Sequence, residues 1–141
     1  MKIIVLTGKP NSGKTTTFEM LYDLLTKNMK NKPKINKIPN TPKKDFQCIL
    51  TYKKKKVAIF SAGDNLFLIC SAIFIYSEFD YIIVAHSQSP SGKDKGRIIE
   101  LTKANKHQTL IVKTECKKGS SQKVIDKANA KDCKKIIKAI K

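Results

Sequence analysis

The chain has 141 residues, 40% of them hydrophobic, which is enough for one domain, residues 1–141, with a single buried core. Its longest apolar run, residues 66–76, has about half the length that a membrane-spanning helix requires, so no membrane span is expected. The net charge of +18 comes almost wholly from lysine, with Arg97 the only arginine, which argues against specific nucleic-acid binding because base recognition draws on arginine. A basic surface that attracts nucleotides or other polyanions remains open.

The first predicted strand leads into a glycine-rich segment, Gly8-Lys9-Pro10-Asn11-Ser12-Gly13-Lys14-Thr15. The apolar run Ile3-Ile4-Val5-Leu6 before it is typical of a strand that is buried on both faces. Residues 15–29 after it carry apolar side chains at helical spacing, at Phe18, Leu21, Tyr22, Leu25 and Met29. The segment fits the phosphate-binding pattern G-x-x-x-x-G-K-[ST] at every constrained position, with strand, loop and helix in the required order.

The chemistry of phosphate binding explains these residue types. Gly8 and Gly13 allow positive φ and a close approach of the backbone to an anion, and the N–H groups of the loop would point at that anion. Lys14 would bind the β- and γ-phosphates, Thr15 would be a ligand of Mg²⁺, and Thr16 would reach the α-phosphate. The intervening Lys9, Pro10, Asn11 and Ser12 complete the predicted nucleotide-binding loop.

Residues 2–17 resemble the opening of the P-loop NTPases, a superfamily of parallel-sheet α/β proteins that bind ATP or GTP with Mg²⁺. Further along, Val57-Ala58-Ile59-Phe60-Ser61-Ala62-Gly63-Asp64 is similar to a group of short bacterial proteins that are described only as ATP-binding proteins. The resemblance covers most of the chain in outline. It implies nucleotide binding but no particular reaction.

Residues 30–45 contain Pro33, Pro39 and Pro42 among lysines and asparagines, so we expect a long mobile loop without a regular element. Thr41 in this loop is a candidate for a second hydroxyl facing Mg²⁺, and a lysine-rich connector is the alternative. The apolar runs 46–52 and 57–60 follow, and the short join between them predicts an antiparallel hairpin at the edge of the sheet.

P-loop enzymes hold Mg²⁺ or its waters with an aspartate at the end of a buried strand beside the loop. When Gly63 is aligned with the glycine of a D-x-x-G pattern, Phe60 stands where that aspartate belongs, and Phe60 cannot bind a metal. The nearest carboxylate is Asp64. It is a candidate both for the N-cap of the following helix and for positioning a Mg²⁺-bound or attacking water.

A helix over 65–78 and a buried strand over 81–85 come next, and His86, Ser87 and Gln88 follow where ligands bind in open α/β sheets. For His86 an ordinary loop position is the alternative. Residues 89–97 form a basic loop in which Lys93 and Arg97 are candidates for a cation on the γ-phosphate, with a solvated loop as the alternative. A helix over 98–105, a strand over 109–112 and a final helix from residue 120 complete the chain. Neither 105–108 nor 113–116 fits the guanine-reading pattern, so GTP has no support over ATP.

These elements predict a three-layer α/β domain like that of P-loop NTPases, with about five mostly parallel strands and an antiparallel edge hairpin. The predicted function is Mg²⁺-dependent binding of ATP or GTP with hydrolysis of the γ-phosphate, in which Lys14, Asp64 and Arg97 are catalytic and Thr15 and Asp64 serve the metal. A kinase for a small non-nucleotide acceptor and a non-catalytic nucleotide-responsive module are the alternatives, and a protein partner or a homodimer stays open. The four cysteines form no C-x-x-C pair, which suits buried thiols in a reducing cytoplasm.

Overall fold

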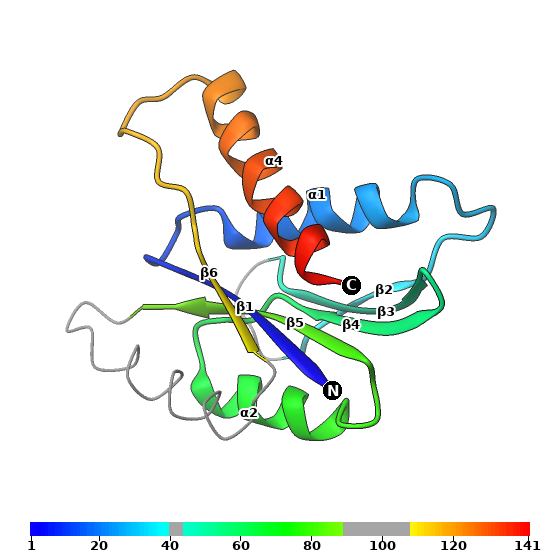
Figure 1. Ribbon diagram of the computed structural model, residues 1–141. Helices are drawn as coiled ribbons and strands as arrows, with labels where there is room; N and C mark the ends of the chain where they lie inside the picture. Colours follow the sequence, from blue (N-terminus) through cyan, green and yellow to red (C-terminus); the bar gives the residue numbers. More distant parts are fainter. Residues whose placement is uncertain (40–43, 89–107) are drawn as a thin grey trace.

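A six-stranded mixed sheet forms the centre of the computed structural model, in which residues 1–39, 44–88 and 108–141 are described (Figure 1). The strands are β1 (Lys2–Gly8), β2 (Ile35–Lys37), β3 (Phe46–Tyr52), β4 (Lys55–Phe60), β5 (Tyr81–Ser87) and β6 (Gln108–Val112). Their order is β2-β3-β4-β5-β1-β6. The pairs β4–β5, β5–β1 and β1–β6 are parallel, whereas β2–β3 and β3–β4 are antiparallel.

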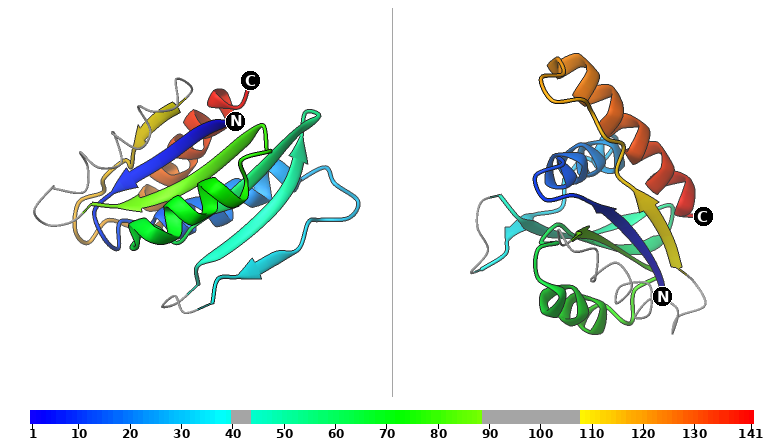
Figure 2. Two further views of the ribbon diagram at one scale, coloured as in Figure 1. Left: turned by 90° about the horizontal axis from the view of Figure 1, so that it is seen from below. Right: turned by 90° about the vertical axis from the view of Figure 1, so that its left-hand side faces the viewer.

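Helices cover both faces of this sheet among the described residues. Helices α1 (Lys14–Thr26) and α4 (Gln122–Ala139) lie on one face, and α2 (Leu66–Ile75) lies on the other (Figures 1 and 2). Two apolar cores result, one between the sheet and the pair α1 and α4, the other between the sheet and α2. The described part of the chain is therefore an α/β fold with a mostly parallel sheet, as the sequence predicts.

The burial of each strand follows its place in the sheet. The interior strand β1 is buried from Ile3 to Leu6 with at most 1% exposure, because it pairs with a strand on each side and both of its faces are covered. In contrast, β3 alternates between buried Cys48 and Leu50 under α1 and half-exposed Ile49 on the opposite face. A strand with one covered face shows this period of two.

The prediction that residues 30–45 contain no regular element is wrong. Strand β2 lies between Pro33 and Pro39, and its three residues pair antiparallel with Phe46–Cys48 of β3. A strand this short at the edge of the sheet avoids both prolines, and edge positions tolerate proline nearby because one side of the strand needs no partner. The sheet consequently has six strands rather than about five, and its antiparallel edge consists of β2, β3 and β4.

The turn of the β3–β4 hairpin is tighter than the sequence suggests. Only Lys53 and Lys54 connect the strands, and both have positive φ, 48° and 64°. Positive φ at both central residues is the mark of a type I′ turn, for which Asn-Gly is the preferred sequence. Lys53 and Lys54 therefore adopt a left-handed backbone conformation that Asn and Gly adopt more readily than Lys does.

Helix α2 is unusually apolar for a helix at the surface. Its ten residues include no charged side chain, and Phe67, Phe74 and Ile75 are exposed by 75%, 83% and 67%. No helix in the described ranges is long and apolar enough to cross a membrane. The cysteines are all free; Cys48 and Cys133 are buried, which raises the pKa of each thiol to about 11, whereas Cys70 is half-buried and Cys116 exposed. The expected helix over 98–105 falls outside the described residues.

Candidate functional site

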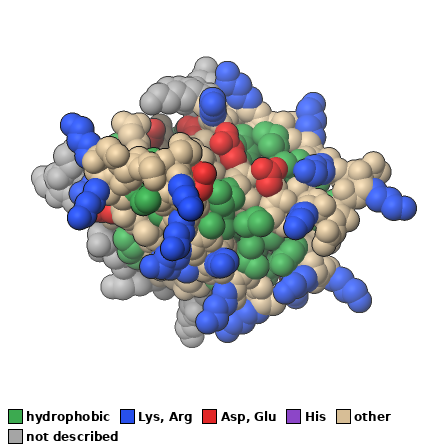
Figure 3. All heavy atoms as spheres, turned by 90° about the horizontal axis from the view of Figure 1, so that it is seen from above, with side chains coloured by type: hydrophobic (Ala, Val, Ile, Leu, Met, Phe, Trp, Pro, Cys, Tyr) green, Lys and Arg blue, Asp and Glu red, His purple; other side chains and the backbone are tan. Residues whose placement is uncertain are grey.

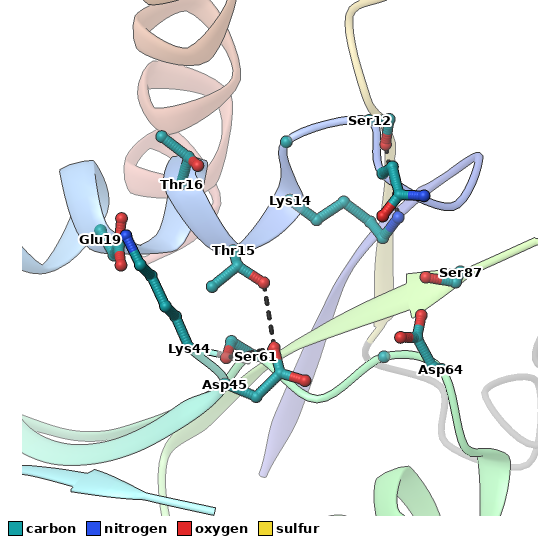
Figure 4. Close-up of a pocket in the computed structure, with 13 residues that line it drawn as sticks. Ser12, Lys14, Thr15, Thr16, Glu19, Lys44, Asp45, Ser61, Asp64 and Ser87 are labelled. Atoms are coloured by element: carbon teal, nitrogen blue, oxygen red, sulfur yellow. Dashed lines mark hydrogen bonds between the residues drawn. The ribbon is translucent and has the colours of Figure 1, made fainter. Parts of the chain in front are cut away.

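A cavity of about 430 Å³ opens at the carboxyl ends of β1, β4 and β5, beside the loop 9–13 that joins β1 to α1. Figure 4 shows this cavity with the side chains that surround it. The loop is called the glycine loop, because Gly8 and Gly13 bound it. The residues that line the cavity are Asn11, Ser12, Gly13, Lys14, Thr15, Thr16, Glu19, Lys44, Asp45, Ser61, Gly63, Asp64 and Ser87.

The glycine loop needs both of its glycines. Gly13 has a φ of +83°, a conformation that L side chains rarely adopt. A Cβ on Gly8 would lie 2.8 Å from the Cβ of Lys113 and 3.0 Å from the Oγ of Ser12. Gly13 also precedes α1 as its N-cap without a side-chain hydrogen bond, which leaves amide groups of the first helical turn available to an anion.

The ammonium group of Lys14 lies inside the curve of the loop. Its Nζ donates to the carbonyl oxygens of Lys9 at 2.6 Å and of Gly8 at 3.4 Å, and it lies 3.4 Å from the Oγ of Ser12. The residue is only 6% exposed. Burial lowers the pKa of Lys14 below its ordinary value; Lys113 adds to this shift, whereas Asp64 and Asp45 oppose it. A bound phosphate would place a negative charge beside this buried ammonium and favour its protonated form.

The most informative contact of the site involves a residue that the sequence does not single out. The Thr15 hydroxyl donates to Asp45 Oδ1 at 3.0 Å, drawn as a dashed line in Figure 4, and the Ser61 hydroxyl lies 3.3 Å from the same oxygen. Asp45 is 9% exposed. Burial raises its pKa, and the nearby Asp64 raises it further, while the hydrogen bonds from Thr15 and Ser61 and the charge of Lys14 act against the increase.

Asp45 could not be found by searching the ends of parallel strands. It stands directly before the first residue of β3, and β3 runs antiparallel to β4, so that Gln47 pairs with Phe60. The start of β3 therefore lies at the same edge of the sheet as the end of β4. The predicted hairpin could have pointed to Asp45, because the first residues of a strand antiparallel to β4 lie at the edge where β4 ends.

Asp64 lines the cavity as expected, but it does not cap α2. The N-cap is Asn65, whose Oδ1 accepts a hydrogen bond from the amide of Phe67 at 2.9 Å. Asn65 has the extended backbone of an N-cap, with φ −127° and ψ 114°, and it begins the helix one residue later than predicted. Figure 4 shows the carboxylates of Asp45 and Asp64 and the amine of Lys14 directed toward the same space from three separate parts of the chain.

The strand that ends at Phe60 does not lie beside β1. Strand β5 pairs with both β4 and β1 and separates them. Phe60 belongs to the core under α2, and it is absent from the residues that line the cavity. The backbone of Gly63 is close to β5 instead: its carbonyl accepts from the Ser87 amide at 2.8 Å, and a Cβ there would lie 2.7 Å from the carbonyl carbon of Ala85.

The three polar residues at the end of β5 have different places. Ser87 lines the cavity. His86 is buried, and its Nδ1 lies 2.9 Å from the Thr7 hydroxyl, which also receives the Gln88 side-chain amide at 3.5 Å. The main-chain amide of Gln88 donates to the carbonyl of Gly8 at 2.8 Å. His86 and Gln88 thus support the start of the glycine loop, whereas Ser87 faces the site.

A second cavity of about 430 Å³ lies on the other side of the glycine loop. Its walls are residues 9–13, the connection from β6 to α4, and the N-terminal half of α4, including Ile125 and Asn129. The side chain of Asn129 approaches the loop, with its Oδ1 3.1 Å from the Thr17 hydroxyl, while its Nδ2 is buried and has no hydrogen-bond partner among the described residues.

A buried ion pair connects this second cavity to α4. Lys113 Nζ donates to Asp132 Oδ2 at 3.0 Å, and both side chains are at most 2% exposed. The same carboxylate accepts from the Thr114 amide at 2.9 Å and from the Thr114 hydroxyl at 2.6 Å. Burial alone would raise the pKa of Asp132, but the hydrogen bonds from Thr114 and Lys113 outweigh it and hold the pKa below its ordinary value.

The structure thus brings together most of the predicted site residues. The cavity lining includes Asn11, Ser12, Gly13, Lys14, Thr15, Thr16 and Asp64, and Lys9 and Pro10 line the second cavity. Thr41, Lys93 and Arg97 fall outside the described residues. No protein-family model matches the chain, and a comparison with curated proteins finds no similar sequence.

Proposed function

We propose that the chain binds a nucleoside triphosphate, ATP or GTP, with Mg²⁺, and hydrolyses the γ-phosphate. The observation that carries this proposal is the convergence, in one cavity, of the buried ammonium of Lys14, the open N-terminus of α1 and the Thr15–Asp45 contact. A cation inside a ring of backbone groups and two adjacent oxygen donors suit a polyphosphate and its metal ion better than any uncharged ligand.

The donor set fits magnesium. Thr15 and Asp45 offer a hydroxyl and a carboxylate oxygen that already lie 3.0 Å apart, and Mg²⁺ prefers hard oxygen ligands with one or two carboxylates. Among the described residues no group of three or more His, Cys, Asp or Glu side chains is arranged to hold a metal. Phosphate oxygens would have to complete the coordination, as in other Mg²⁺-nucleotide sites. When bound, Mg²⁺ would neutralise charge on the β- and γ-phosphate oxygens.

The remaining residues have complementary roles in this proposal. Gly8, Ser12 and Gly13 would shape the loop around the phosphates, and Thr16 would contact the α-phosphate. Asp64, directed into the cavity from the start of α2, would orient the attacking water. The second cavity, beside the same loop, has room for the nucleoside. Arg97 keeps its predicted role as a cation for the transition state.

One observation favours a second candidate, a nucleotide-responsive binding module without hydrolysis. The strands that end at the cavity place serines, Ser61 and Ser87, where a carboxylate would activate a water most directly. The described residues that line the cavity include three carboxylates, Glu19, Asp45 and Asp64. Because Asp45 is assigned to the metal, Asp64 is the candidate for activating the water. Free phosphate released from ATP or GTP over time would support hydrolysis, whereas binding with unchanged nucleotide would favour the module.

The deciding experiment is thermal unfolding with ATP and with GTP, each with and without Mg²⁺. A ligand at about a hundred times its Kd stabilises the folded state by roughly 2.7 kcal/mol, which corresponds to a rise of roughly 5–10 °C in Tm for a domain of this size. Lys14→Ala should abolish the rise. Lys27→Ala is the matched control, because Lys27 is exposed at the C-terminal end of α1 and lines neither cavity. A rise that persists in Lys14→Ala would contradict the proposal.

A further inference from the structure

The exposed face of α4 carries a continuous stripe of lysines. Lys123, Lys127, Lys131, Lys134 and Lys138 are all exposed, at spacings of four, four, three and four residues. With 3.6 residues per turn, these positions fall within about 80° of the helix circumference and extend over about 22 Å along its axis. These five residues are the lysine stripe.

Nothing in the described part of the chain neutralises the lysine stripe. None of the salt bridges found there involves any of its five members; on α4 only Lys135, off the stripe, pairs with Asp132. The one exposed acid on the helix, Asp126, accepts a hydrogen bond from Gln122. Figure 3 looks down on α1 and α4, and shows lysine side chains spread over this side of the molecule with few acidic side chains among them.

The stripe reduces the stability of its own helix. Like charges four residues apart on a helix repel each other, and Lys123 with Lys127, Lys127 with Lys131, and Lys134 with Lys138 form such pairs. A surface helix usually alternates lysine with glutamate and gains from the same spacing. A uniformly positive face is unfavourable for the free protein and becomes favourable only against a polyanion.

We propose that the lysine stripe binds the phosphate backbone of nucleic acid, without reading its sequence. A row of point charges on a straight helix complements a regular row of phosphates, and such contacts give affinity and position but no base specificity. The described face offers neither arginine nor aromatic side chains for contacts to bases. This proposal does not depend on the nucleotide site, because the stripe lies on the side of α4 opposite the residues that pack on α1.

The burial of α4 argues against a membrane as the partner. A helix that binds a lipid surface inserts its apolar face between the headgroups. In α4 that face is occupied: Cys133 and Ile136, with Ile140 at the C-cap, belong to the core, and Cys133 Sγ lies 3.2 Å from the Thr17 carbonyl oxygen. Val124 is the only hydrophobic residue of α4 that is exposed. The lysines of α4 therefore remain exposed, but its apolar face is not free to insert into a membrane.

The test compares two variants of equal charge. One replaces Lys127, Lys131, Lys134 and Lys138 with Gln, and the control replaces Lys30, Lys32, Lys34 and Lys37, which are exposed on and before the edge strand β2. Each variant lowers the formal net charge of +18 by four. The probes are fluorescein-labelled 20-nucleotide single- and double-stranded DNA and vesicles of anionic lipid, with affinity followed by anisotropy or sedimentation over a series of salt concentrations.

We expect the wild type to bind DNA with a log K that falls linearly with log salt, by about 0.9 for each phosphate neutralised on the duplex. The stripe variant should lose at least tenfold in affinity at low salt, and its slope should decrease by up to about 3.6, whereas the control should lose less than threefold. Equal losses in both variants would overturn the proposal, because binding would then depend on total charge. Binding to vesicles but not to DNA would overturn it as well, as would the absence of DNA binding.

Discussion

The hydroxyl of Thr15 and the carboxylate of Asp45 are joined by a hydrogen bond of 3.0 Å across thirty residues of chain. This contact connects the first turn of α1 to the start of β3, in the cavity that Lys14 also lines. In the proposed function both oxygens would bind the metal ion.

Asp45→Asn should remove Mg²⁺ dependence while preserving the fold. An amide still accepts from Thr15 and Ser61 but offers no charge to a divalent cation. We expect the effect of Mg²⁺ on nucleotide affinity to decrease at least tenfold, measured by calorimetric titration with and without Mg²⁺. Asp23→Asn, on the exposed side of α1, is the control. Full Mg²⁺ dependence in Asp45→Asn would assign the metal to Asp64 instead.

The same variant should have a different pH dependence of stability. Burial raises the pKa of Asp45, so the folded state binds this proton more tightly than the unfolded state does. The stabilising contribution is complete below the unfolded pKa and is lost as the pH rises through the folded pKa. Without nucleotide at pH 7, Asp45→Asn should therefore be at least as stable as the wild type in urea unfolding. A large loss of stability would show that the charge itself is required for folding.

Asp132 should show the opposite dependence on pH. Its pKa is held below the ordinary value, so its contribution is present above the unfolded pKa and is lost as the pH falls through the folded pKa. Asp132→Asn leaves buried Lys113 without its counter-charge, which should cost about 3–5 kcal/mol. Asp126→Asn, on the exposed side of the same helix, should cost less than about 0.5 kcal/mol. Chemical unfolding at pH 7 and pH 4 distinguishes the two variants.

Gly63→Ala should disturb the end of β5. The new Cβ would lie 2.7–2.9 Å from main-chain atoms of Ala85 and His86, and a backbone cannot rotate away as a side chain can. We expect a loss of about 1–3 kcal/mol in the free energy of unfolding. Gly119→Ala separates sterics from backbone strain, because its Cβ would meet nothing within 4 Å although φ is +81°. Its cost should be about 1 kcal/mol, and a wild-type Tm for Gly63→Ala would refute the predicted clash.

The β3–β4 turn offers a stabilising change. Replacing Lys53-Lys54 with Asn-Gly supplies the residues that a type I′ turn favours and removes two positive-φ lysines. The free energy of unfolding in urea should rise by about 1 kcal/mol. Nucleotide affinity should not change, because the turn precedes β4 and the cavity lies at the other end of that strand. The converse swap, Lys55→Asn with Lys56→Gly, removes the same charge from regular strand positions and should be destabilising.

Prediction from sequence succeeds here where the signal is local. Strand β1, the glycine loop and α1 are contiguous, and their residue types reflect burial and backbone requirements within a few positions. The burial of β5 and the amphipathic α4 also follow from local periodicity. Such patterns need no knowledge of which elements become neighbours.

The errors concern neighbours in space. The order of strands places β5 between β1 and β4, which no spacing in the sequence reveals, so the strand that ends at Phe60 does not lie beside β1. Asp45 was missed because it stands just before the start of a strand rather than at the end of one. Asn65 and Asp64 are equally good caps by residue type, and only the backbone conformation at Asn65 decides between them.

The position of β1 has a consequence for how the protein folds. It is the first strand in the chain, yet its neighbours are β5 and β6, so Lys2 faces Tyr81 and Ile3 faces Gln108. The antiparallel strands β2, β3 and β4 can assemble early from nearby residues, whereas β1 must wait for the second half of the chain. The glycine loop would therefore take its shape only after β5 and β6 have joined β1, although both strands follow it in the sequence. Under the proposed function, phosphate binding would then appear only when the sheet is complete, and it would report the final folding step.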